Sequence, residues 1–81
     1  MELERLMWQL AESGVTVVLK ADHERFAEGG PYWTLFISGS RLGDDGPVHA
    51  DEGTLNQCLT VGLTRLLERG PEWIWVKDFI A

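Results

Sequence analysis

Two short segments of the chain, residues 15–20 and 32–38, alternate their side chains as a β-strand requires. Both segments are rich in β-branched and aromatic residues, which favour a pleated backbone. The connection between them ends in Glu28-Gly29-Gly30-Pro31, a sequence typical of turns. We therefore predict an antiparallel hairpin whose loop is about ten residues long and holds a helical turn around residues 24–26.

The hairpin is flanked by two segments with the periodicity of amphipathic helices. Residues 2–13 carry apolar side chains at spacings of three and four, and Gly14 follows where a left-handed cap is favourable. Residues 55–68 repeat this pattern after Thr54, which forms a capping box with Gln57. Gly62 lies inside this second helix, so we expect the helix backbone to approach the sheet or the first helix closely there.

The remaining segments allow more than one structure. Residues 39–51 are polar and rich in glycine, and residues 47–50 within them could form a short third strand. The tail, residues 72–81, contains Trp73 and Trp75 and is mostly apolar. It could form a final strand or a short helical turn.

Together these elements predict one α+β domain over residues 1–81, in the order helix, strand, strand, optional strand, helix. A small antiparallel sheet of two to four strands would be covered by the two helices on one face. The other face would then present five side chains: Thr16, Val18, Tyr32, Thr34 and Phe36. This face is too apolar to be left in water without a reason, so we expect the tail or another chain to cover it.

The element order resembles the topology of double-stranded-RNA-binding domains over most of the chain, without a shared sequence motif. The resemblance implies RNA binding through basic residues where the last helix begins. The corresponding residues here are Asp51-Glu52-Gly53-Thr54, which include no lysine or arginine. Acidic side chains would repel phosphates, so we expect no RNA binding and do not assign the chain to this family.

The composition excludes further classes of partner. The 81 residues include 13 acidic and 7 basic side chains, for a net charge of -6, which opposes binding to nucleic acid. No apolar run approaches the roughly 18–20 residues of a membrane span, so we expect no membrane partner. The single cysteine excludes an internal disulfide, which is typical of a reducing compartment, and we predict a cytoplasmic protein.

The residues with reactive side chains do not form a known catalytic or metal-binding pattern. Cys58 lies on the apolar stripe of the second helix, which predicts a buried, inert thiol. His23 and His49 have acidic neighbours but lack the spacing of a zinc or EF-hand site. The glycines of residues 39–43 lack the Gly-Lys-Ser/Thr ending of a phosphate loop. We therefore predict that the chain has no catalytic, cofactor-binding or metal-binding residue and is not an enzyme.

The aromatic residues remain as the main functional signal, because tryptophan and tyrosine are enriched at interface hot spots. We expect a small, acidic, non-catalytic protein-interaction module that binds a protein partner or itself as a homodimer. The predicted contact residues are Val18, Tyr32, Phe36, Trp73 and Trp75. One alternative is an acidic inhibitor or adaptor, of the kind that phages and mobile elements encode, that binds a basic surface of a host protein. A nucleic-acid binder of the topology named above is a lesser alternative.

Overall fold

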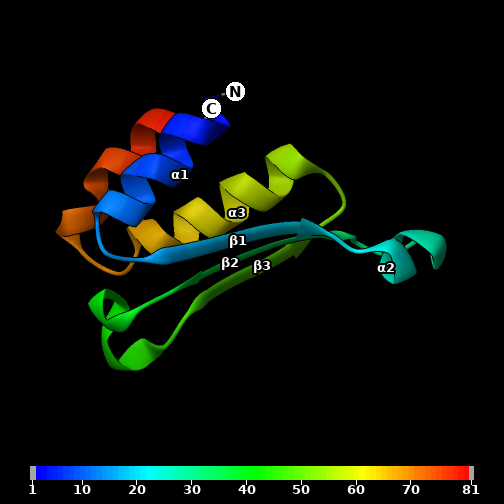
Figure 1. Ribbon diagram of the computed structural model, residues 1–81, viewed down its shortest axis with the longest axis horizontal. Coiled ribbons are helices and arrows are strands. Elements are labelled where there is room, and N and C mark those ends of the chain that lie inside the picture. Colours follow the sequence, from blue (N-terminus) through cyan, green and yellow to red (C-terminus); the bar gives the residue numbers. More distant parts are fainter. Residues whose placement is uncertain (1, 81) are drawn as a thin grey trace.

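A computed structural model describes residues 2–80, so the two ends of the predicted 1–81 domain, Met1 and Ala81, lie outside the described residues. The elements are, in chain order, α1 (Leu3–Glu12), β1 (Thr16–Ala21), α2 (His23–Ala27), β2 (Trp33–Ser38), η1 (Ser40–Asp45), β3 (Val48–Glu52), α3 (Leu55–Leu67) and η2 (Pro71–Phe79). Elements η1 and η2 are 3-10 helices. The helices α1 and α3 and the segment η2 form one layer, and the sheet forms the other (Figure 1). The fold is thus the predicted α+β arrangement.

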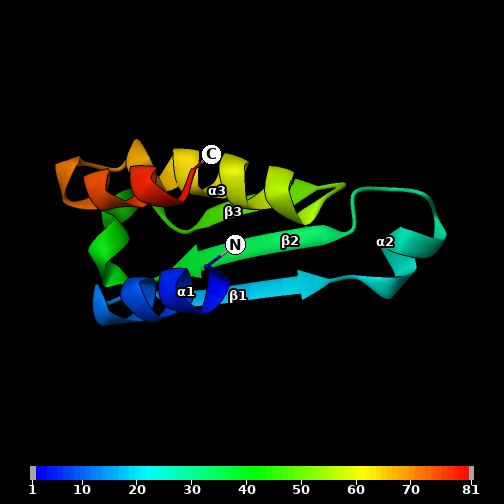
Figure 2. The same cartoon turned by 90° about the horizontal axis from the view of Figure 1, so that it is seen from above.

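The sheet has three antiparallel strands in the order β1-β2-β3. Its register places Val18 of β1 opposite Phe36 of β2, and Phe36 opposite His49 of β3. The predicted third strand is confirmed, although it covers Val48–Glu52 and so extends two residues beyond residues 47–50. The predicted helical turn in the hairpin loop is also confirmed as α2, which projects beyond the end of the sheet (Figure 2).

The core lies between the inner face of the sheet and the helical layer. Helix α1 lies over β1, and α3 lies over β3 with η2 beside it (Figure 2). Buried apolar side chains from both layers meet there, among them Leu6, Leu10, Leu35, Ile37, Leu63, Leu66 and Trp73. A Cβ atom on Gly62 would collide with the side chain of Leu35 and would lie 3.6 Å from the Cβ of Ala50. The predicted close approach of this helix to the sheet is therefore confirmed.

The tail adopts the helical alternative rather than the strand. Element η2 begins with Pro71, a residue that fits the first helical position because it lacks an N–H that would have no partner there. Trp73 and Val76 are buried and Phe79 is partly buried, and this spacing of three residues matches the turn of a 3-10 helix. Since strands bury alternate residues, the same spacing is incompatible with a fourth strand.

The glycine-rich segment after β2 is held by a side chain that follows α3. Arg69 donates to the carbonyl oxygen of Gly46 at 2.6 Å and to that of Pro47 at 3.2 Å. Gly43 and Gly46 both have positive φ angles, of 73° and 77°, which glycine adopts without strain. This segment therefore forms the turn that brings β3 alongside β2. None of the helices in residues 2–80 is long and apolar enough to cross a membrane.

Candidate protein-interaction surface

The side of the sheet that faces away from the helices is accessible to a partner, and we call it the open face. Its side chains come from alternate positions of the three strands: Thr16, Val18, Lys20, Thr34, Phe36, Ser38, His49 and Asp51. The helices of the layer all lie on the other side of the sheet (Figure 1). Of the described residues, only the short helix α2 reaches one end of the open face, through Arg25.

The middle of the open face is apolar. Val18 is 48% exposed and Phe36 is 37% exposed, and the register places them directly opposite each other. The ring of Phe36 meets that of His49 edge-on, with 6.1 Å between the ring centroids. Val18, Phe36 and His49 thus form one row across the three strands, which we call the central row.

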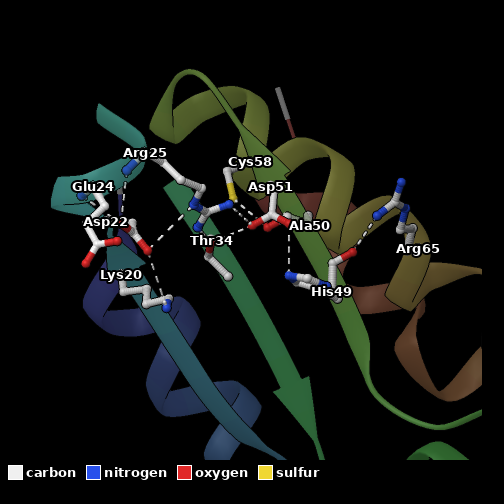
Figure 3. Close-up of polar contacts among 10 residues, drawn as sticks. All are labelled: Lys20, Asp22, Glu24, Arg25, Thr34, His49, Ala50, Asp51, Cys58 and Arg65. Carbon is white, nitrogen blue, oxygen red and sulfur yellow. Dashed lines mark hydrogen bonds and ion pairs between the residues drawn. The ribbon is translucent and has the colours of Figure 1, made fainter. Parts of the chain in front are cut away.

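Next to the central row, the α2 end of the open face holds a polar network (Figure 3). Arg25 Nη1 donates to Asp51 Oδ1 at 2.8 Å, and the hydroxyl of Thr34 donates to the same oxygen at 2.5 Å. Arg25 also donates to the Thr34 hydroxyl. The other carboxylate oxygen of Asp51 lies 3.0 Å from His49 Nε2. Asp51 therefore joins α2, β2 and β3 through one side chain.

This network is suited to holding the structure together rather than to catalysis. The hydrogen bonds from Thr34 and Arg25 lower the pKa of Asp51 to about 2. A carboxylate with so low a pKa is a weak base, and a general base works best when its pKa is near the operating pH. Thr34 donates its proton to this weak base, so the pair lacks the means to activate the hydroxyl as a nucleophile.

Tyr32 lies at the α2 end of the open face, immediately before β2. Its ring meets Phe26 of α2 edge-on, with 4.9 Å between the centroids, and lies 5.8 Å from the ring of Trp33. Its side chain is half-buried by these contacts. Of the predicted contact residues, Val18, Phe36 and Tyr32 are therefore on one side of the molecule.

The two tryptophans of the tail lie on the opposite side, in the helical layer. Trp73 is only 1% exposed and belongs to the core. Trp75 is half-buried and packs edge-on against Phe79, whose ring in turn lies 4.8 Å from the guanidinium carbon of Arg5. The tail thus does not cover the open face, and that half of our expectation is wrong. The apolar spacing of three in residues 73–79 is the sequence signal that could have placed it correctly.

The thiol of Cys58 lies where the sequence suggested. Cys58 is buried beneath the sheet, where burial raises the pKa of its thiol, and its sulfur lies 3.4 Å from the carbonyl oxygen of Ala50. The prediction of a core cysteine is confirmed. Within residues 2–80, no three His, Cys, Asp or Glu side chains gather closely enough to hold a metal ion.

No protein-family model matches the chain, and neither the curated proteins nor the solved structures contain a significant match to it. The functional interpretation therefore depends on the chemistry of the open face and its edges.

Proposed function

We propose that this chain is a non-catalytic protein-interaction module that associates with itself through the β1–β2 side of the open face. The observation that carries the proposal is the exposed Val18–Phe36 pair, two apolar side chains on directly opposite positions of adjacent strands. Removing apolar surface from water is favourable by about 25 cal/mol for each Å². A second copy that brings its own apolar side chain against this pair would gain that free energy.

The distribution of charge favours a second copy as the partner. The chain has a net charge of -6, so two copies repel each other at most orientations. On the open face, however, the one carboxylate is Asp51, and it is already paired with Arg25. Lys20 adds a positive charge on the same face. Two copies can therefore meet on this side without bringing unpaired carboxylates together.

Sedimentation velocity at micromolar concentration tests the proposal with a matched pair of variants. Val18→Ser removes the more exposed apolar side chain of the pair, at 48%, whereas Ile74→Ser removes a side chain that is 55% exposed in η2, in the opposite layer. We expect wild type and Ile74→Ser to sediment as dimers and Val18→Ser to shift toward the monomer. A monomeric wild type, or equal effects of the two substitutions, would contradict the proposal.

The alternative of an acidic adaptor or inhibitor stays a prediction, supported by the surplus of six negative charges. It differs from self-association in its dependence on salt, because attraction to a basic surface weakens as ionic strength rises. Contact between apolar side chains changes little under the same conditions. The cytoplasmic location also stays a prediction, which rests on the lone buried cysteine.

A further inference from the structure

The two edges of the sheet differ in how their backbone groups are used. The N–H of Asp22 donates to the carbonyl oxygen of Tyr32 at 2.8 Å, one position beyond the β1–β2 register. Hydrogen-bonded pairs alternate along an antiparallel ladder, so the even-numbered residues of β1 direct their backbone groups toward β2. The N–H and C=O groups of Val17 and Leu19 then point away from the sheet, along its outer edge.

At the other edge, β3 is occupied in part, at the carbonyl oxygen of His49. The same alternation directs the backbone of His49 outward, and its carbonyl oxygen accepts a hydrogen bond from the Arg65 guanidinium of α3 (Figure 3). At the β1 edge, by contrast, no hydrogen bond within residues 2–80 reaches the outward groups of Val17 and Leu19. Figure 2 shows β1 along one margin of the molecule, with α1 over its first half and no further strand outside it. An exposed edge of this kind is a ready template for a further strand.

The side chains at the β1 edge are also incompletely covered. Val17 and Leu19 are partly buried, and with Leu3 and Met7 of α1 they line an apolar gap in the core that is too small for water. The strand contains no proline, and its register with β2 is unbroken over six residues. Residues 13–21 carry one positive charge, on Lys20, and no negative charge. Asp22 follows directly, and its carboxylate lies 3.9 Å from Lys20 Nζ and 3.6 Å from Arg25 Nε. This edge is therefore apolar and regular, and its nearest carboxylate is paired with cations.

We propose that two copies of the chain join by pairing β1 with β1 antiparallel, about a twofold axis through Val18, to form one continuous six-stranded sheet. This inference rests on the proposed self-association and specifies its geometry. Opposite residues of an antiparallel pair lie on the same face of the sheet. A twofold axis must therefore place one residue opposite the same residue of the second copy, and not opposite its chain neighbour. An axis through Val18 pairs residues 15–21 of one copy with the same residues of the second copy in reverse order, and so uses the whole strand.

The register at Val18 is also the one that the side chains favour. It places Val18 opposite Val18 of the second copy, and it joins the two central rows into one continuous apolar row. It places Lys20 opposite Thr16 of the second copy, whose hydroxyl can accept a hydrogen bond from the ammonium group. An axis through Leu19 would instead place Lys20 opposite Val18. With the axis through Val18, the outward backbone groups of Val17 meet those of Leu19 of the second copy, as hydrogen bonding requires.

Cysteine substitution tests the register directly. In the proposed pair, the two Cα atoms at position 18 are about 4.5 Å apart, as in a non-hydrogen-bonded pair, which a disulfide can span. The two Cα atoms at position 16, or at position 20, are about 13 Å apart along the strand direction, which is too far. All three positions are exposed on the same face of the same strand, so Thr16→Cys and Lys20→Cys are matched controls for Val18→Cys. The native Cys58 is buried and does not compete.

Under mild oxidation we expect Val18→Cys to form a cross-linked dimer at least about tenfold faster than either control alone. A mixture of Thr16→Cys and Lys20→Cys should cross-link faster than each variant by itself. Similar rates for all three variants in a dimeric protein would overturn the edge pairing while leaving self-association in place. A wild-type chain that stays monomeric up to high micromolar concentration would overturn both proposals.

Discussion

Arg25 of α2 donates a hydrogen bond to Asp51 of β3 over 2.8 Å, and the two residues are 26 positions apart in the chain. Helix α2 has only five residues and buries none of them, so its own hydrogen bonds are insufficient to keep it folded. Its first turn is capped by Asp22, which accepts from the N–H groups of Glu24 and Arg25 at 2.9 and 3.2 Å. The Arg25–Asp51 contact then fixes this projecting helix to the end of the sheet.

The first prediction concerns the dependence of stability on pH. The pKa of Asp51 falls from 3.8 to about 2 in the folded chain, so its ionised form contributes stability above pH 3.8. This contribution is lost as the pH falls through about 2, where the folded carboxylate takes up a proton. We expect Asp51→Asn to lower the free energy of unfolding at pH 7 by about 1 kcal/mol, reduced by solvent screening. Urea denaturation at several pH values measures this.

The control for this prediction is Asp44→Asn, at an exposed carboxylate of η1. Its effect on stability should be within about 0.5 kcal/mol at pH 7. The difference between wild type and Asp51→Asn should shrink between pH 4 and pH 2. A constant difference for Asp51→Asn over that range would show that its charge is not the cause.

The second prediction concerns the contact between α3 and the sheet. Gly62→Ala would improve the intrinsic helix propensity of α3 by about 1 kcal/mol. The new methyl group, however, would collide with Leu35, which is itself buried in the core. Overpacking of this kind costs roughly 1–3 kcal/mol, so we expect a net loss of stability of about 1 kcal/mol.

A double-mutant cycle shows whether the collision is the cause. Leu35→Ala alone should cost about 2–5 kcal/mol, because it leaves a cavity beneath α3. Combined with Gly62→Ala, it should cost less than the sum of the two single effects, since the new methyl group enters the space that Leu35 vacates. Chemical denaturation of the four proteins gives this coupling. Strict additivity would mean that Leu35 and Gly62 do not restrict each other.

The third prediction separates a structural role of the tail from a role in binding. Trp73 is buried in the core, so Trp73→Ala should destabilise the fold by about 3–5 kcal/mol. Ile74→Ala, at the exposed neighbouring position, should change stability by less than about 0.5 kcal/mol. Trp73→Phe keeps more of the buried volume, and the folded variant should still associate as wild type does. Loss of association in folded Trp73→Phe would place the tail at the interface.

Much of the fold was predictable because local pattern and tertiary packing agree. The alternation of residues 15–20 and 32–38 predicted two strands that the structure contains. The capping box at Thr54 predicted the start of α3, and Thr54 accepts a hydrogen bond from the N–H of Gln57 at 3.1 Å. The close approach at Gly62 also followed from the sequence, because a glycine inside a helix lowers its stability unless packing requires it. The turn residues before Pro31 correctly indicated the loop that contains α2.

The sequence left two structures open for the tail and did not indicate the polar network, for different physical reasons. Trp73 and Trp75 are separated by two positions, as on one face of a strand, but only Trp73 is fully buried because η2 is a 3-10 helix that turns every three residues. The Asp51–Arg25 contact joins residues that are distant in the chain, and no local pattern encodes such a pairing. The difference between the open β1 edge and the partly occupied β3 edge likewise depends on Arg65 reaching a distant strand.

Amide hydrogen exchange, followed residue by residue at two protein concentrations, tests the central claim most directly. The amide of Val18 points toward β2 and should be protected at both concentrations, so it serves as an internal reference. The amides of Val17 and Leu19 should exchange rapidly in dilute solution and become protected at high concentration, as β1 pairs with β1 of a second copy. Rapid exchange of both amides at every concentration would contradict the account.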